Sequence, residues 1–286
     1  MKSRGLLLLA AWLLAQAASA CQLQQAPATD DTAAWQSRAL ALLPCLGHPD
    51  PKLRDEGAFE TFAAWMRDKR LQPATLQSMR AQLVAVLRAP PDAAGVHQPF
   101  AILLLAELAR ADRLQPYLSL EERAELVSLG ATWLEQVRDY RGLSDTEGWR
   151  HGVAHAADLA LQLGLNPALD RAQRQRLLQA VSSQVLADGT RGGHHAYRFG
   201  EGQRLARAAL NLHLQLGTSA AEWAAWLQAI AAPIEPGGVW DELRLARMHN
   251  LREFLWPLMA GVLQVPDAVL REAWLKSIQE VLQKLG

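Results

Sequence analysis

The chain has 286 residues, 50% of them hydrophobic, and its 29 Lys and Arg residues balance its 29 Asp and Glu residues. This balance argues against a nucleic-acid-binding protein, which needs a basic face to neutralise phosphates. Only 2 Cys residues occur, which excludes a disulfide-stapled scaffold, and the hydrophobic content of so long a chain supports a sizeable core.

Residues 1–20 have the features of a secretory signal peptide. Lys2 and Arg4 precede an uncharged stretch from Gly5 to Ala18, and small residues lead up to Cys21. The stretch is shorter than the ~20 apolar residues of a confident membrane span. Removing the signal takes away both basic residues, leaving 27 basic against 29 acidic residues and a net charge of −2.

Two processing routes are open at Cys21. The small residues directly before it resemble the lipobox of bacterial lipoproteins, although Ala18 stands where Leu is usual. That resemblance implies an N-terminal lipid anchor on Cys21 and an outer-membrane lipoprotein facing the periplasm, because Gln22 is not the acidic residue that retains such proteins at the inner membrane. With ordinary cleavage the protein is instead soluble in the periplasm, and a Cys21–Cys45 disulfide becomes possible in that oxidising compartment.

After a polar spacer at 21–31, residues 32–286 are predicted to form a single all-α domain. Helix-favouring residues are abundant, and no segment shows the alternation typical of a strand. The predicted helices cover residues 33–46, 51–70, 73–89, 98–112, 120–139, 146–163, 170–187, 201–216, 220–231, 239–263 and 267–284.

Several helix starts are predicted from capping sequences. Asp50 precedes a proline at the first helical position, and three capping boxes begin at Ser119, Ser144 and Ser219, each with Glu three residues later. Similar helix lengths and short loops favour stacked antiparallel helical hairpins, an α-solenoid or α-α superhelix of the HEAT-like kind. The glycine-rich segment 188–203 is predicted to be a long loop, and such loops are often functional.

The densest polar cluster lies on the predicted helix at 146–163. His151 and His155 are four residues apart and Asp158 follows by three, so all three share a face. In a first hypothesis the two histidines bind a divalent metal ion and Asp158 orients His155. In a second, the cluster binds a polar organic ligand or acts as acid and base. In a third, the histidines are hydrogen-bonded interior groups that tie helices together.

Other polar and aromatic residues extend the list of candidates. Glu201 could join His155 and Asp158 as a catalytic group, although Glu201 and Arg204 also fit an exposed ion pair. The predicted ligand pocket is built from the face of His151, His155 and Asp158 together with Glu201 and Arg204, and its remaining candidates are Asp139, Arg141, Trp149, Asn250 and Arg252. Further residues that could carry chemistry are His194, His195, Tyr197 and His249.

An ordered series of motifs resembles a bacterial family of uncharacterised helical proteins, domain-of-unknown-function family 2785, over roughly residues 45 to 265. The motifs are Asp139-Tyr140-Arg141-Gly142, Gly148-Trp149-x-His151-x-x-Ala154-His155-x-Ala157-Asp158-Leu159, Gly200-Glu201-x-x-Arg204-Leu205-Ala206 and Asn250-Leu251-Arg252-x-Phe254-Leu255. The resemblance implies a helical architecture but no established activity. It suggests that the separated polar motifs converge on one pocket.

Two function classes follow from these observations. The leading prediction is an exported, envelope-associated binding protein or scaffold with a polar pocket and a possible envelope protein partner, since helical stacks present long surfaces to partners. The alternative is a metal-dependent or acid/base hydrolase that uses the face of His151, His155 and Asp158.

Overall fold

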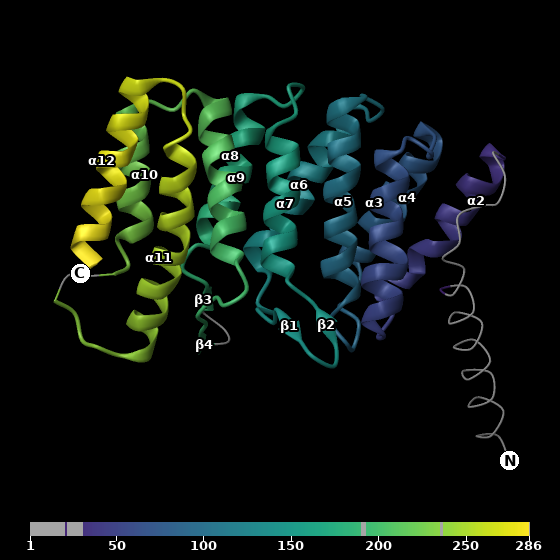
Figure 1. The fold of residues 1–286 in the computed structure, drawn as a ribbon, viewed down its shortest axis with the longest axis horizontal. Coiled ribbons are helices and arrows are strands. Elements are labelled where there is room, and N and C mark those ends of the chain that lie inside the picture. The colour runs from purple at the N-terminus through teal and green to yellow at the C-terminus, as the bar shows by residue number, and fades with distance from the viewer. Residues whose placement is uncertain (1–20, 22–30, 190–192, 235–236, 286) are drawn as a thin grey trace, which may run out of the picture. The chain divides into compact units, whose positions relative to one another are not determined.

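The computed structural model describes residues 21, 31–189, 193–234 and 237–285, and these residues form an all-α protein. The predicted signal peptide and most of the predicted spacer lie outside the described residues. Figure 1 shows the helices as rods that pack lengthwise against their neighbours, as helical hairpins do. No helix among the described residues is long and apolar enough to cross a membrane.

Contacts divide the chain into two compact units. The first unit ends at Tyr117 and also includes Leu143–Arg150. Its elements are α2 (Thr32–Leu42), η1 (Leu43–Gly47), the π-helical η2 (Lys52–Glu60), α3 (Thr61–Arg67), α4 (Pro73–Arg88), α5 (His97–Leu114), β1 (Leu143–Ser144) and β2 (Gly148–Trp149). The helix α5 packs against both α3 and α4 and is buried on most sides.

A fully buried arginine anchors the β1–β2 hairpin within the first unit. Arg54 donates hydrogen bonds to the carbonyl oxygens of Glu147 (2.8 Å) and Trp149 (3.3 Å), and its Nε lies 2.8 Å from Asp55. A side chain at Gly148, which has φ of +70°, would meet Pro51 at 2.4 Å. The hairpin therefore needs glycine here for both conformation and space.

The second unit contains Leu118–Gly142 and the chain from His151 onward. Its elements are α6 (Leu120–Gln136), α7 (Gly152–Gly164), α8 (Arg171–Ser183), β3 (Asp188–Gly189), β4 (Gly193–His194), α9 (Glu201–Leu216), α10 (Ala220–Ala231), α11 (Glu242–Val262) and α12 (Ala268–Leu285). The helix α9 packs against α7, α8 and α11, so it is central to this unit. The capping boxes predicted at Ser119 and Ser219 are both present.

The prediction for 146–163 was wrong at its start. Ser144 Oγ accepts hydrogen bonds from Thr146 N and Glu147 N (3.3 Å each) inside the turn between β1 and β2, so it caps a turn and no helix. The helix begins only at Gly152, and His151 occupies its N-cap with a left-handed φ of +52°. The segment predicted as a loop at 188–203 contains a short pair of strands, β3 and β4, and ends where α9 begins at Glu201.

Cys21 and Cys45 form a disulfide bond, with 5.6 Å between their Cα atoms. Both residues are buried, at 3% and 1% exposure. A sulfur atom in a disulfide cannot also carry a thioether-linked lipid. The disulfide and a lipid on Cys21 therefore exclude each other.

Candidate functional site

The segment 195–200 lies between β4 and α9 and is bound by one amide side chain. Asn250 on α11 is fully buried, and its Oδ1 accepts a hydrogen bond from Tyr197 N at 2.8 Å. Its Nδ2 donates to His195 O (2.7 Å) and Leu186 O (3.0 Å). One side chain thus satisfies three backbone groups that belong to no regular element, which fixes the path of the segment.

Aromatic rings also contact this segment, beginning with Tyr140, which follows α6 in the chain. The ring of Tyr140 stacks on His195, with 5.2 Å between centroids, and meets the edge of Tyr197 at 5.9 Å. Tyr197 is 2% exposed, and its hydroxyl donates to Gln184 O at 2.8 Å. Burial raises the pKa of Tyr197 well above its usual value, so this hydroxyl remains a donor at neutral pH.

Gly142 explains how closely the first motif approaches the segment. A Cβ atom at this position would lie 2.0 Å from the ring of Phe199, so any other residue would displace that ring. The neighbouring Arg141 carbonyl accepts a hydrogen bond from His151 N at 3.0 Å. The motif at 139–142 is therefore tied to both the segment and the start of α7.

A buried histidine and a buried carboxylate meet where the segment enters α9. His151 Nε2 lies 3.6 Å from Glu201 Oε1, and the two residues are 8% and 2% exposed. The other carboxylate oxygen, Oε2, accepts a hydrogen bond from Phe199 N at 2.9 Å. Desolvation, followed by the positive charge of Arg204, lowers the pKa of His151 to about 4, so its ring is neutral at pH 7.

His155 and Asp158 extend this contact along α7. The rings of His151 and His155 meet edge to face, with 5.6 Å between centroids, and His155 is 7% exposed. Asp158 forms an ion pair with Arg204 of α9, on a more exposed edge of the same helix pair. Asp158 therefore pairs with an arginine of the neighbouring helix.

Four candidate pocket residues have other surroundings. The guanidinium of Arg141 pairs with Asp139, two residues away, at 2.8 Å. Arg252 donates to Leu285 O at 2.8 Å, toward α12. Trp149 belongs to the first unit, where its carbonyl oxygen accepts from Arg54.

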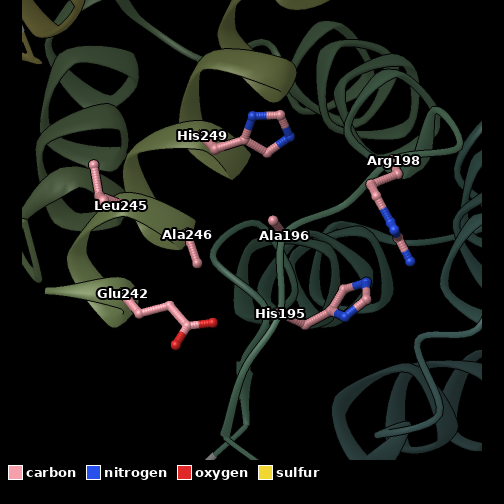
Figure 2. Close-up of a pocket in the computed structure, with 7 residues that line it drawn as sticks. All are labelled: His195, Ala196, Arg198, Glu242, Leu245, Ala246 and His249. Atoms are coloured by element: carbon pink, nitrogen blue, oxygen red, sulfur yellow. The ribbon is translucent and has the colours of Figure 1, made fainter.

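A pocket of about 470 Å³ lies between this segment and the first part of α11. Its lining residues, drawn in Figure 2, are His195, Ala196, Arg198, Glu242, Leu245, Ala246 and His249. The two histidines were candidates from sequence. The other five were missed because they belong to no motif, and the two walls come from segments about 50 residues apart in the chain.

The polar groups of this pocket differ between its two walls. His249 Nε2 lies 2.7 Å from Tyr197 O, and since a carbonyl oxygen only accepts, this nitrogen carries the hydrogen. The other ring nitrogen of His249, Nδ1, accepts a hydrogen bond when it carries no hydrogen itself, as does the carboxylate of Glu242, seven residues earlier on α11. On the opposite wall, desolvation and the charge of Arg198 lower the pKa of His195, so its ring is neutral at pH 7.

The predicted metal site gains no third ligand from the structure. Within the described parts of the chain, no group of three or more His, Cys, Asp or Glu side chains could hold a metal ion. His151 and His155 supply two imidazoles, and Asp158, expected to orient His155, forms an ion pair with Arg204. A structural zinc site normally has four protein ligands and a catalytic one three.

The fold and these contacts define a class of protein, an all-α protein in which separated polar motifs fix one irregular segment beside a pocket. The chain belongs to the family described as "Protein of unknown function (DUF2785)", which matches residues 83–259. No curated protein and no solved structure matches the chain.

Proposed function

We propose that the protein is an exported binding protein of the cell envelope, and that a small polar ligand binds in the pocket lined by His195, Arg198, Glu242 and His249. The pocket volume of about 470 Å³ carries the proposal, since small-molecule sites usually occupy ~300–1,000 Å³ and combine apolar lining with a few convergent polar groups.

Support also comes from the rigidity of one wall. Three backbone groups of the segment are bound by the buried side chain of Asn250 or by His249, and the ring of Tyr140 stacks on His195. A wall fixed before the ligand arrives lowers the entropy cost of binding. Two motif residues of the family, Tyr140 and Asn250, thus share a role in this proposal, as supports of a binding wall.

Export is the second part of the proposal. It rests on the signal-like residues 1–20, and the protein then resides in the envelope either through a lipid on Cys21 or as a soluble periplasmic protein. Within the envelope, a partner protein is a second candidate occupant of the surface around the pocket.

The test is a thermal-shift and calorimetric screen of the mature protein against amino acids, sugars, nucleotides, carboxylic acids and phosphate. We expect a ligand that binds saturably and whose affinity falls at least 10-fold in Arg198→Gln or Glu242→Gln. Its affinity should be unchanged in Arg207→Gln, which alters an exposed arginine of α9 outside the pocket. Absence of any saturable ligand from all five classes would overturn the proposal.

A hydrolase remains the second candidate, because a buried histidine that is neutral at pH 7 lies 3.6 Å from a buried carboxylate. Such a pair can act as base and acid once a substrate reaches it. Turnover of chromogenic ester, phosphoester or peptide substrates that is abolished in Glu201→Gln, with folding retained, would favour this candidate over a binding protein.

A further inference from the structure

We infer that the pocket between segment 195–198 and α11 binds a small zwitterion, of amino-acid or dipeptide size, with its ammonium group toward α11 and its carboxylate toward Arg198. This inference rests on the proposed function and specifies the ligand class of the same pocket. It follows from the charges on the two walls and from the apolar surface between them.

The α11 wall presents hydrogen-bond acceptors. Glu242 and His249 are seven residues apart, so they lie on one face of the helix with ~10 Å of rise between them. Figure 2 shows both side chains leaving the same helix, with Leu245 and Ala246 between them. A carboxylate and the acceptor nitrogen of His249 together suit the several N–H donors of an ammonium or a peptide group.

The opposite wall presents a cation. Arg198 is exposed, and among the described residues no carboxylate forms an ion pair with its guanidinium, which lies 5.7 Å from the ring centroid of Phe199. A guanidinium binds a carboxylate through two parallel hydrogen bonds. His195, in the same wall, adds one N–H donor while its ring is neutral.

The apolar lining separates the two polar groups. Leu245, Ala246 and Ala196 offer contact to an aliphatic side chain, and the volume of about 470 Å³ accommodates a ligand as large as a dipeptide.

Ligands with one charge fit this arrangement less well. A simple anion such as phosphate would pair with Arg198 but would be repelled by Glu242 in the same pocket. A metal cation would be attracted to Glu242 but repelled by Arg198. Only a ligand with both charges gains from both walls, and opposite charges on the two walls also orient it.

The experiment compares zwitterions with analogues that lack one charge. Calorimetry on the mature protein would use the twenty L-amino acids and a set of aliphatic dipeptides. The best ligand is then repeated as its N-acetyl derivative, which has no ammonium, and as its C-terminal amide, which has no carboxylate. Each derivative should bind at least 10-fold more weakly than the zwitterion.

Two variants assign the charges to their walls. In Glu242→Gln the zwitterion and its N-acetyl derivative should bind with similar affinity, because the partner of the ammonium is gone. In Arg198→Gln the zwitterion and its amide should bind with similar affinity, because the partner of the carboxylate is gone. The control Arg207→Gln should keep both discriminations.

Each contrary outcome has a distinct meaning. An N-acetyl derivative that binds wild type as tightly as the zwitterion would overturn the inference in favour of a site for anions alone. No binding by any amino acid or dipeptide would also overturn it. In both cases the proposed binding function would stand if the broader screen yielded a saturable ligand sensitive to Arg198→Gln, and it would fall with the inference if that screen were empty.

Discussion

The side chain of Asn250 binds three backbone groups beside the candidate pocket. It is fully buried and bonds to backbone groups of Leu186, His195 and Tyr197, at 2.7–3.0 Å. The segment from 195 to 200 has neither helical nor sheet partners for these groups. Its conformation therefore depends on the amide, as buried polar groups depend on their hydrogen bonds.

Asn250→Ala should lower the free energy of unfolding by ~2–4 kcal/mol, because buried backbone groups lose their partners. Urea denaturation followed by circular dichroism measures the change. Asn211→Ala is the matched control, since among the described residues the Asn211 amide bonds only to the Arg207 carbonyl within its own helix, and it should cost less than ~0.5 kcal/mol. Equal effects of the two substitutions would contradict the role assigned to Asn250.

The sequence identified Asn250 as a candidate, but its task could not be predicted. Its motif gives a residue on a helix, whereas its partners lie 53 and 64 positions away in segments without periodicity. The same limit applies to Arg198 and Glu242, whose shared pocket arises only when α11 packs beside the end of β4. By contrast, His151 and Glu201 were both candidates and do meet, although the sequence placed His151 inside a helix that in fact begins one residue after it.

Mass spectrometry can determine whether Cys21 forms a disulfide or carries a lipid. A Cys21–Cys45 disulfide predicts a mature protein without diacylglyceryl mass and without free thiols before reduction. Cys45→Ser should then lower stability by ~2–4 kcal/mol, as loss of a disulfide usually does. A lipid-modified mass for the wild-type protein would contradict this prediction and establish the anchored route.

At the scale of elements, the contact of α9 with α11 depends on Gly202. A Cβ atom there would lie 2.7 Å from the backbone carbon and oxygen of Glu253, which cannot rotate away as a side-chain end can. This close approach places Glu201 and Asn250 on neighbouring helices around the segment. The glycine therefore sets the spacing on which both the buried pair and the pocket wall depend.

Gly202→Ala should force the two helices apart and destabilise the protein by ~1–3 kcal/mol, the usual cost of overpacking. Gly261→Ala provides the comparison, because its Cβ would meet only the end of the Leu210 side chain, at 2.6 Å. There the gain in helix propensity, up to ~1 kcal/mol, offsets the adjustment of a flexible neighbour. Thermal unfolding of both variants checks the contrast, and similar melting temperatures would refute it.

Helices were well predicted from caps and periodicity, and the start of α7 shows where such prediction fails. The spacing of Ser144 and Glu147 matches a capping box. However, the hydrogen bonds from backbone N–H groups to Ser144 Oγ also close the hairpin turn. Arg54 stabilises the hairpin rather than a helix, because it donates hydrogen bonds to two hairpin carbonyl oxygens that lie 93 and 95 residues away in the chain. Local sequence cannot contain that information.

At the scale of the whole molecule, two buried histidines couple stability to pH. Besides His151, the protein buries His213, which is 2% exposed between Trp223 and Trp226, with its Nδ1 2.9 Å from Thr218 Oγ1. Desolvation lowers the pKa of His213 to about 3, against a smaller opposing effect of Glu222. Both histidines are therefore neutral in the folded protein at pH values where an unfolded chain binds protons.

The sign of the pH dependence follows from this difference. Unfolded histidine has a pKa of ~6.5, so as pH falls below that value the unfolded state takes up protons that the folded state does not. Folding free energy should be lost from about pH 6.5 down to about 4 for His151 and about 3 for His213, at up to ~1.4 kcal/mol per pH unit for each.

Urea denaturation between pH 7.5 and 4.5 should thus show a steep decline in stability for the wild type. His213→Asn should reduce the slope while lowering stability at pH 7.5, because the amide fills less of the cage of tryptophans. His151→Asn should also reduce the slope, because the group that takes up the proton in the unfolded chain is gone. Asparagine is chosen here because it tolerates the left-handed conformation at φ of +52°. The double variant should be the least pH-dependent of the four proteins. Parallel declines in all four would mean that other groups carry the acid sensitivity and that neither histidine is held neutral by burial.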